Sequence, residues 1–303
     1  MKYVITGATG NTGKRIAAQL LAAGHEVVAI SRQEAHLAEL TAQGAIPAAG
    51  SLDDAAFLSH AFAGADAVYA LIPPNFQAPD FRAYQRTIGE AIVSALKTSG
   101  VHHVVTLSSY GAHRPDTGVV GGLYDFEQLL ARELPEARVL HLRAGFFMEN
   151  FFGMIPAVQQ AGVLGGFPLP ADQPMAVVTT QDIAEVAARR LQALDFSGHS
   201  HVSVAHAQLI TLREAAAILG AAIGKPELPY VQFPDEQFRA IMQSIGASGS
   251  LIDGYLEFGR AAASGALSEG TDIRPGDGTP TSLHDFAPAW AGAYAQASAA
   301  QPA

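Results

Sequence analysis

The chain has 303 residues, of which 49% are hydrophobic and 15% are charged, and its formal net charge is −10. This composition predicts a folded chain with a sizeable core, and an acidic balance without a lysine or arginine cluster argues against nucleic acid as a direct partner. The absence of cysteine excludes disulfides, thiolate metal sites and a cysteine nucleophile. No apolar run is long enough to span a bilayer, and Met1 leads into a predicted strand without a signal peptide, so we expect a cytoplasmic protein without a membrane partner.

The first predicted strand runs through a glycine-rich turn into a helix, because residues 3–16 read Y-V-I-T-G-A-T-G-N-T-G-K-R-I. A strand over residues 2–6 and a helix over 11–23 are the context that a dinucleotide-binding loop requires. Glycines let the main chain approach a pyrophosphate, toward which the helix N-terminus directs its N–H groups. The spacing is G-x-x-G-x-x-G rather than G-x-G-x-x-G, and a turn without a ligand is the alternative. The predicted pyrophosphate site comprises Gly7, Thr9, Gly10, Asn11, Thr12 and Gly13.

Strand and helix patterns then alternate at short intervals. Further strands are predicted over residues 25–30, 45–49, 67–72, 103–108 and 138–143, and helices over 34–43, 55–63, 81–99 and 125–133. Such βα units predict an α/β fold of the Rossmann type with a doubly wound parallel sheet. Ligands of these sheets bind beyond the carboxyl ends of the strands, which here are Gly7, Ser31 and residues 71–74, 108–110 and 144–146.

The end of the second strand carries the signal for the type of cofactor. An acidic residue at this point binds the adenine ribose of NAD(H), whereas an arginine accommodates the 2′-phosphate of NADP(H). The chain offers Ser31 and Arg32 there, with no acidic residue before Glu34. A guanidinium suits phosphate, so we predict NADP(H) as the cofactor. The alternative is that Arg32 is only a solvated charge after a strand.

The second half of the chain has a different pattern. Residues 151–174 are rich in glycine, proline and aromatic residues, and a helix is predicted from Thr180 to residue 193. Residues 201–205 read as a strand that could return to the first sheet, and helices follow over 212–223, 235–245 and 251–263, with turn formers over 265–280. We therefore predict a cofactor domain over residues 1–150, with a return of residues 176–205 to it, and a smaller, mainly helical substrate lobe over 151–303.

Three stretches together resemble one family: T-G-A-T-G-N-T-G at residues 6–13, S-R at 31–32 and L-R-A-G-F-F-M-E-N-F at 142–151. The chain resembles the NmrA-like family of atypical short-chain dehydrogenase/reductases over nearly its whole length. The resemblance implies a Rossmann domain with a smaller C-terminal lobe and NADP(H) as the ligand. It also implies either a reductase, as for quinones and dyes, or a protein that senses the nucleotide without turning it over. By position it places the cofactor's adenine, ribose and nicotinamide near Ser51, Leu52, Leu71, Ile72, Pro73, Ala144, Gly145, Phe146 and Phe147, and the serines at the end of the fifth strand, Ser108 included, could also bind the cofactor.

Neither acid–base arrangement of such enzymes is complete in this chain. The nearest match to the Y-x-x-x-K motif, in which lysine lowers the pKa of the tyrosine, pairs Tyr124 with Gln128. In reductases that place a histidine four residues before a glutamate, Glu127 fits the glutamate but Leu123 occupies the histidine position. A tyrosine after the fifth strand could donate a proton into the cleft, or only pack there. The candidate catalytic residues are Tyr110, Glu127 and Tyr124.

Two functions from different classes remain open. The first is an NADPH-dependent reductase of a small, flat acceptor such as a quinone, dye or enone, for which position matters more than a strong acid–base pair. Aromatic residues near 146–167 would form its wall. The second is an NADP(H)-binding redox sensor that signals to a protein partner. His199, His201 and His206 lack neighbouring carboxylates, so we predict no metal site, and we expect a monomer or a homodimer.

Overall fold

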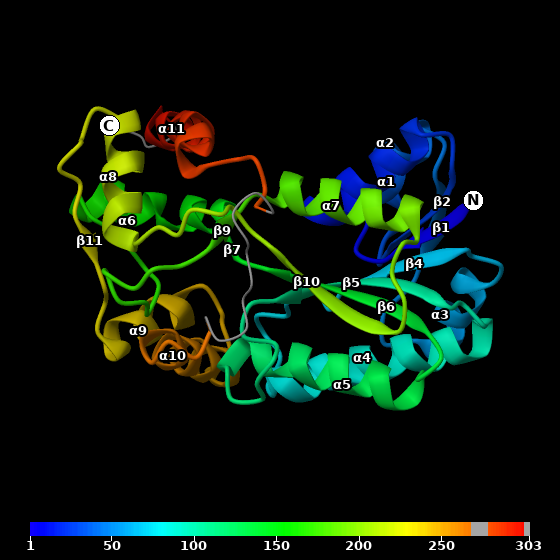
Figure 1. Ribbon diagram of the computed structural model, residues 1–303. Coiled ribbons are helices and arrows are strands. Elements are labelled where there is room, and N and C mark those ends of the chain that lie inside the picture. The colour runs from blue at the N-terminus through cyan, green and yellow to red at the C-terminus, as the bar shows by residue number, and fades with distance from the viewer. Residues whose placement is uncertain (268–277, 300–303) are drawn as a thin grey trace.

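The computed structural model describes residues 1–267 and 278–299. Its centre is a seven-stranded sheet in which each neighbouring pair of strands is parallel, as Figure 1 shows. The predicted doubly wound parallel sheet is confirmed. In spatial order the strands are β10 (His199–Val204), β6 (Arg138–Ala144), β5 (His103–Ser109), β4 (Ala67–Ala70), β1 (Lys2–Ile5), β2 (Glu26–Ser31) and β3 (Ile46–Ala49).

Helices cover both faces of this sheet (Figure 1). On one face the apolar sides of α1 and α7 pack over the sheet, where Ile16 and Ile183 join one core with Tyr3. On the other face α3, α4 and α5 lie side by side and bury Leu58 and Phe126 in a second core. The bounds are α1 (Asn11–Ala22), α3 (Ala55–Phe62), α4 (Phe81–Ser99), α5 (Gly121–Glu133) and α7 (Thr180–Ala193), and α2 (Ala38–Ala42) follows a 3₁₀ turn, η1 (Glu34–Leu37).

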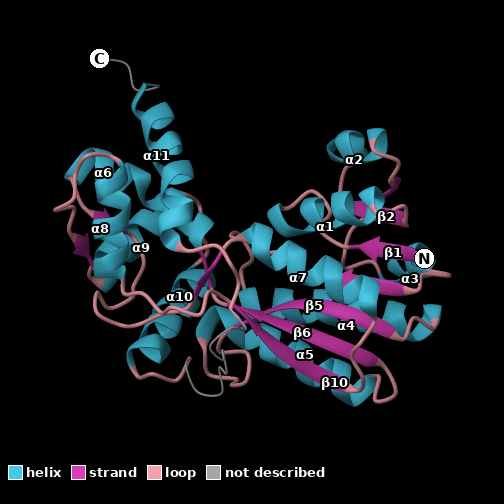
Figure 2. Ribbon diagram, turned by 45° about the horizontal axis from the view of Figure 1, so that its top comes forward, coloured by secondary structure: helices cyan, strands magenta, loops and turns pink. Residues whose placement is uncertain are grey.

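The second half of the chain forms a mainly helical lobe at the carboxyl ends of the strands, with α6, α8 and α11 on one side and α9 and α10 on the other (Figures 1 and 2). Its core is centred on Trp290, which is fully buried and donates from Nε1 to the carbonyl oxygen of Phe151 at 2.9 Å. Two short parallel pairs join the lobe: β7 (Phe146–Phe147) with β9 (Val177–Val178), and β8 (Leu164–Gly165) with β11 (Tyr230–Val231). The helices are η3 (Met148–Met154), α6 (Ile155–Ala161), α8 (Leu212–Ala222), α9 (Asp235–Ser244), α10 (Gly249–Ala263) and α11 (Leu283–Ala299), and a short 3₁₀ turn, η2 (Gly118–Val120), precedes α5.

The short elements β7, η3, α6, β8, β9 and β11 were not predicted, and two longer helices also differ from the sequence prediction. Helix α5 begins at Gly121 rather than at residue 125, because Gly121 and Gly122 serve close packing: a Cβ atom on Gly122 would lie 2.1 Å from Oε1 of Gln85 on α4. Helix α11 was not predicted, and the expected turn formers over 265–280 fall partly outside the described residues. A search of residues 1–267 and 278–299 finds no helix that is long and apolar enough to cross a membrane.

Candidate cofactor and acceptor site

The turn between β1 and α1 folds tightly back on itself. Gly7 has a φ of +60°, in the left-handed region that favours glycine, and its carbonyl oxygen accepts the N–H of Gly10 at 2.9 Å. A Cβ atom on Gly13 would lie 2.3 Å from that same oxygen. A Cβ atom on Gly10 would meet only this oxygen, at 3.3 Å. The fold therefore requires Gly7 and Gly13, whereas Gly10 leaves space that a ligand can fill.

The N-terminus of α1 presents hydrogen-bond donors to this space. Gly10 is the N-cap without a side-chain cap, and the first helical bond runs from the N–H of Lys14 to its carbonyl oxygen. The N–H groups of residues 11–13 therefore have no partner within the helix. The buried Tyr69 donates its hydroxyl to Oγ1 of Thr12 at 3.2 Å, so the Thr12 hydrogen remains for another acceptor. These donors and the helix dipole suit an anion.

Arg32 stands at the end of β2 with its side chain exposed, and its guanidinium makes no ion pair within residues 1–267 and 278–299. The neighbouring cation on α1, Lys14, is instead engaged by Glu39 at 2.6 Å. The carbonyl oxygen of the buried Ser31 accepts the N–H of Gly50 at 3.0 Å, which brings Ser51 next to this strand end. A free guanidinium beside the glycine turn is the arrangement that a 2′-phosphate needs.

A cavity of about 500 Å³ opens beyond the carboxyl ends of β4, β5 and β6. Ile72, Ser108 and residues 144–147, all predicted to bind the cofactor, lie in its wall. The remaining predicted cofactor residues lie outside this cavity, at the carboxyl ends of β1 to β4, in the turns that follow or in the first turn of α1. The structure thus places the predicted residues along one edge of the sheet and only part of them in the cavity.

The second lobe closes the cavity with aromatic rings. The ring centroid of Phe167 lies 5.3 Å from that of Phe146 and 6.1 Å from that of Tyr255, both in edge-on geometry. We call Phe146, Phe167 and Tyr255 the aromatic wall; all three line the cavity. Among the described residues that line it, none carries a charged side chain. The cavity therefore suits an uncharged, apolar molecule.

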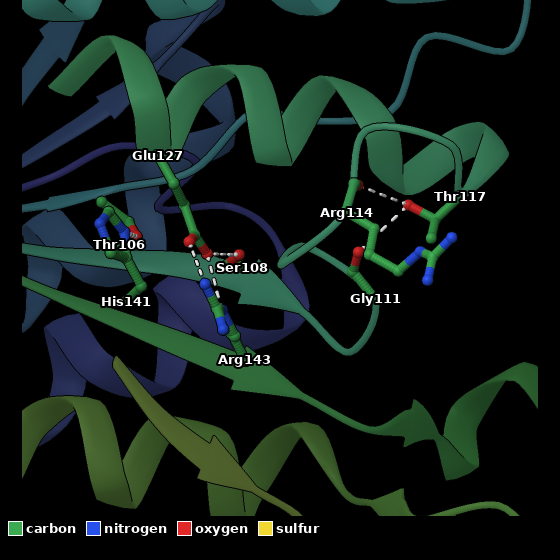
Figure 3. Close-up of polar contacts among 8 residues, drawn as sticks. All are labelled: Thr106, Ser108, Gly111, Arg114, Thr117, Glu127, His141 and Arg143. Carbon is green, nitrogen blue, oxygen red and sulfur yellow. Dashed lines mark hydrogen bonds and ion pairs between the residues drawn. The ribbon is translucent and has the colours of Figure 1, made fainter. Parts of the chain in front are cut away.

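A buried polar cluster connects β5, β6 and α5, and one of its members lines the cavity (Figure 3). Ser108 on β5 donates its hydroxyl to Oε1 of Glu127 on α5 at 2.6 Å. Arg143 on β6 forms a bidentate ion pair with the same carboxylate, in which Nε donates to Oε1 at 3.1 Å and Nη2 donates to Oε2 at 2.6 Å. The side chains of Glu127 and Arg143 are only 5% and 15% exposed. Ser108 alone of the three lines the cavity.

The two candidate tyrosines occupy different places. Tyr110 reaches the cavity wall, but desolvation raises the pKa of its buried hydroxyl to about 12. Ser203 lies near enough to offset part of this shift, without the geometry of a hydrogen bond. Tyr124 is half-buried on α5 and does not line the cavity. A phenol with a pKa near 12 is a weak general acid at neutral pH.

Two residues before Ser108 and Arg143 on the same strands, Thr106 Oγ1 and His141 Nδ1 are 2.8 Å apart (Figure 3). Burial lowers the pKa of His141 to about 4, and the opposing charges of Glu127 and Arg143 have smaller effects. On the next strand Nε2 of His199 lies 3.0 Å from the carbonyl oxygen of Leu134. Within the described part of the chain, no three histidine or acidic side chains group as metal ligands would.

Comparison with known proteins places this fold and site in a family, since the sequence profile of the NmrA-like family matches residues 2–277. The chain belongs to the NmrA-like family. The resemblance of the three sequence stretches is thereby confirmed.

Among its NmrA-like relatives, a (4-alkanoyl-5-oxo-2,5-dihydrofuran-3-yl)methyl phosphate reductase of Streptomyces griseus is 30% identical over 231 residues, 74% of each chain. The solved structure of the NADPH-dependent quinone oxidoreductase QOR2 from Escherichia coli, complexed with NADPH, is 25% identical with a TM-score of 0.76, covering 95% of this chain and 98% of that one. Triphenylmethane reductase from Citrobacter sp., complexed with NADP(H), shares the fold with a TM-score of 0.75 at 19% identity, covering 96% and 100% of the two chains. Both of these neighbours were thus solved with the cofactor that the sequence predicts for this chain.

Sequence reasoning missed several polar residues in or behind the cavity wall. Arg143 is the partner of Glu127, and the signal was available because a lone arginine interrupts the buried strand pattern L-H-L-R-A. Gln85 on α4, Asn150 in η3 and Gln173 line the cavity itself. Gln85 is 4% exposed and donates from Nε2 to the carbonyl oxygen of Val119 at 3.2 Å. None of these three lining positions stands out in a single sequence.

Proposed function

We propose that this chain is an NADPH-dependent reductase that transfers hydride to a small, flat, uncharged acceptor such as a quinone or an enone. The observation that carries the proposal is the aromatic-walled cavity at the carboxyl ends of β4, β5 and β6, which has no charged side chain among its described lining residues. When bound, the cofactor supplies the hydride. The protein then has to bind both molecules, orient them and exclude water.

The residues of the first half fit the cofactor. The pyrophosphate would meet the N–H groups at the start of α1, above the space that Gly10 leaves open. Arg32 would hold the 2′-phosphate, and Ser51 and Leu52 would lie beside the adenine. Residues 71–73 and 144–147 would hold the ribose and nicotinamide at the entrance of the cavity. We accordingly assign residues 1–150 and the returning segment 176–205 to the cofactor domain.

The acceptor would lie against the second lobe. Stacking on the aromatic wall favours a flat ring system, and this contact needs no charge complementarity. The Streptomyces relative acts on a phosphate ester, whereas the described lining of this cavity offers no lysine or arginine to such a group. Burying a charge without a partner is costly, so we propose that neutral acceptors are preferred over phosphorylated or cationic ones.

Proton delivery does not require a residue of this chain. The titratable candidates are still Tyr110, Glu127 and Tyr124. However, the pKa of Tyr110 is raised to about 12, and Glu127 forms an ion pair with Arg143. We propose that the reduced acceptor takes its proton from water after hydride transfer, as a quinone can.

The test is steady-state NADPH oxidation with a panel of matched acceptors: a neutral naphthoquinone, its sulfonate, a cationic triphenylmethane dye and a phosphorylated butenolide. We expect the neutral quinone to have the highest kcat/KM. Tight NADPH binding without turnover of any acceptor would favour the sensor function over the reductase. Equal or better turnover of the charged compounds would contradict the proposed acceptor class while leaving the reductase intact.

A further inference from the structure

The cluster of Ser108, Glu127 and Arg143 fixes the direction of one hydrogen bond (Figure 3). Oγ of Ser108 and Oε1 of Glu127 are 2.6 Å apart, so one hydrogen lies between the two oxygens. Glu127 forms a two-pronged ion pair with Arg143, and an ionised carboxylate only accepts hydrogen bonds. The hydrogen therefore belongs to Ser108.

This assignment decides what Ser108 offers to the cavity. A serine hydroxyl has one hydrogen and two lone pairs, and the hydrogen is already used. Toward the cavity that it lines, Ser108 can therefore present only a lone pair. It accepts a hydrogen bond from a ligand and donates none. A carbonyl acceptor has no hydrogen to give, whereas the nicotinamide riboside half of the cofactor carries hydroxyl and amide donors.

We propose that Glu127 and Arg143 are positioning residues that hold Ser108 as a hydrogen-bond acceptor for an O–H or N–H donor of the nicotinamide riboside. The inference rests on the proposed NADPH binding. Its basis is the burial of the ion pair and its hydrogen bond to Ser108, the one member of the cluster that lines the cavity. A buried ion pair by itself is weak evidence for stability, so a role in orientation accounts better for its presence.

The test uses variants that change the direction of the hydrogen bond without changing the shape of the site. Glu127→Gln removes the negative charge that fixes the direction of this hydrogen bond. With the amide oxygen on Nη2 of Arg143, which makes the shorter contact, the amide N–H₂ takes the place of Oε1 and faces both Ser108 and the N–H of Arg143 Nε. The hydroxyl hydrogen of Ser108 is displaced toward the cavity, where it meets the donor of the ligand. We expect the Kd for NADPH to rise on the order of 10-fold, from one lost hydrogen bond and a donor–donor conflict. Ser108→Ala should raise it by a similar factor.

The double variant Ser108→Ala with Glu127→Gln separates positioning from a general structural effect. Because Glu127 acts through Ser108, the double variant should bind NADPH no more weakly than Ser108→Ala alone. Binding of 2′,5′-ADP, which lacks the nicotinamide riboside, should be unchanged in all three variants. Glu133→Gln, on the exposed side of the same helix in an ion pair with Lys97, is the matched control and should bind NADPH normally.

Titration of each protein with NADPH and with 2′,5′-ADP gives these values directly. The proposal is overturned if Glu127→Gln binds NADPH as tightly as the unmodified protein, or if the two single effects multiply in the double variant. An equal loss of 2′,5′-ADP binding would also overturn it, because the change would then act on the whole fold. If the unmodified protein binds neither compound, the proposed cofactor itself fails, which is a separate outcome.

Discussion

The carbonyl oxygen of Gly7 occupies the position that a Cβ atom on Gly13 would need, with only 2.3 Å between them. Both atoms belong to backbone, so neither can rotate away. The corresponding contact for Gly10 is 3.3 Å, and the chain conformation there, with φ at −82°, is open to any residue. The three glycines of the turn therefore differ in what they do: two allow the fold, and one leaves space for a ligand.

Substitution of the two later glycines should separate these roles. Gly13→Ala forces α1 away from the turn and should lower the melting temperature and abolish NADPH binding together. Gly10→Val should abolish NADPH binding while costing only about 1 kcal/mol of stability, since a valine at the N-cap is mildly unfavourable. Thermal unfolding and NADPH titration of the two variants check this. Normal binding by Gly10→Val would place the pyrophosphate elsewhere.

The cofactor preference should depend on Arg32. Arg32→Asp replaces a charge-assisted contact with repulsion, so NADPH binding should weaken by roughly 10- to 100-fold while NADH binding changes little. Calorimetric titration with both nucleotides measures the ratio. Arg132→Asp, which removes an exposed arginine on α5, is the control for net charge. Equal affinity of the unmodified protein for NADH and NADPH would contradict the prediction.

Burial of His141 should make the protein sensitive to mild acid. The pKa of His141 is about 4 in the folded state and ordinarily about 6.5. Between these pH values the unfolded chain binds a proton at this histidine and the folded chain does not. This contribution to stability is complete above pH 6.5 and is lost as pH falls toward 4, with a total on the order of 3 kcal/mol.

His141→Asn keeps an acceptor near the Thr106 hydroxyl and removes the titration. Its free energy of unfolding should therefore fall less steeply than that of the unmodified protein between pH 6.5 and 4. Denaturant unfolding across this range provides the comparison, and His60→Asn, at an exposed position on α3, should follow the unmodified protein. Parallel pH curves for His141→Asn and the unmodified protein would show that His141 is not the source.

Tyr110→Phe should retain most of the reductase activity, because a hydroxyl with a pKa of about 12 contributes little as a general acid at neutral pH. Steady-state rates with a neutral quinone, measured between pH 6 and 9, test this. A loss on the order of 100-fold would identify Tyr110 as the proton donor and would contradict proton uptake from water.

The sequence carries local signals for the cofactor half of the candidate site and few for the acceptor half. Strand ends, glycines and the arginine after β2 are local signals, because each residue acts through the backbone next to it. The cavity depends on contacts between distant segments: Phe167 meets Phe146 and Tyr255 only after the second lobe has packed against the sheet. The partnership of Glu127 with Arg143 is likewise invisible without the alignment of α5 over β6.

Two misread helices have local explanations. Gly121 and Gly122 look like helix breakers, yet they let α4 and α5 approach closely, so α5 begins at Gly121. Helix α11 was overlooked because alanine and an internal Pro288 obscure its pattern. Its start did carry a signal, since Asp285 accepts hydrogen bonds from both the backbone and the hydroxyl of Ser282 in the manner of a capping box.

The aromatic wall gives the prediction that bears most directly on the acceptor. Phe167 belongs to the second lobe and contacts the rings of Phe146 and Tyr255, so its loss should affect the acceptor more than the cofactor. In Phe167→Ala we expect the KM for a neutral quinone to rise on the order of 10-fold, because about 0.5–1.5 kcal/mol of stacking free energy is lost. The Kd for NADPH should stay unchanged. Phe76→Ala removes a phenylalanine that is 40% exposed and does not line the cavity, and it should leave both values unchanged. An unchanged quinone KM in Phe167→Ala would mean that the acceptor binds away from the second lobe. A rise in both constants would mean that the ring holds the nicotinamide instead.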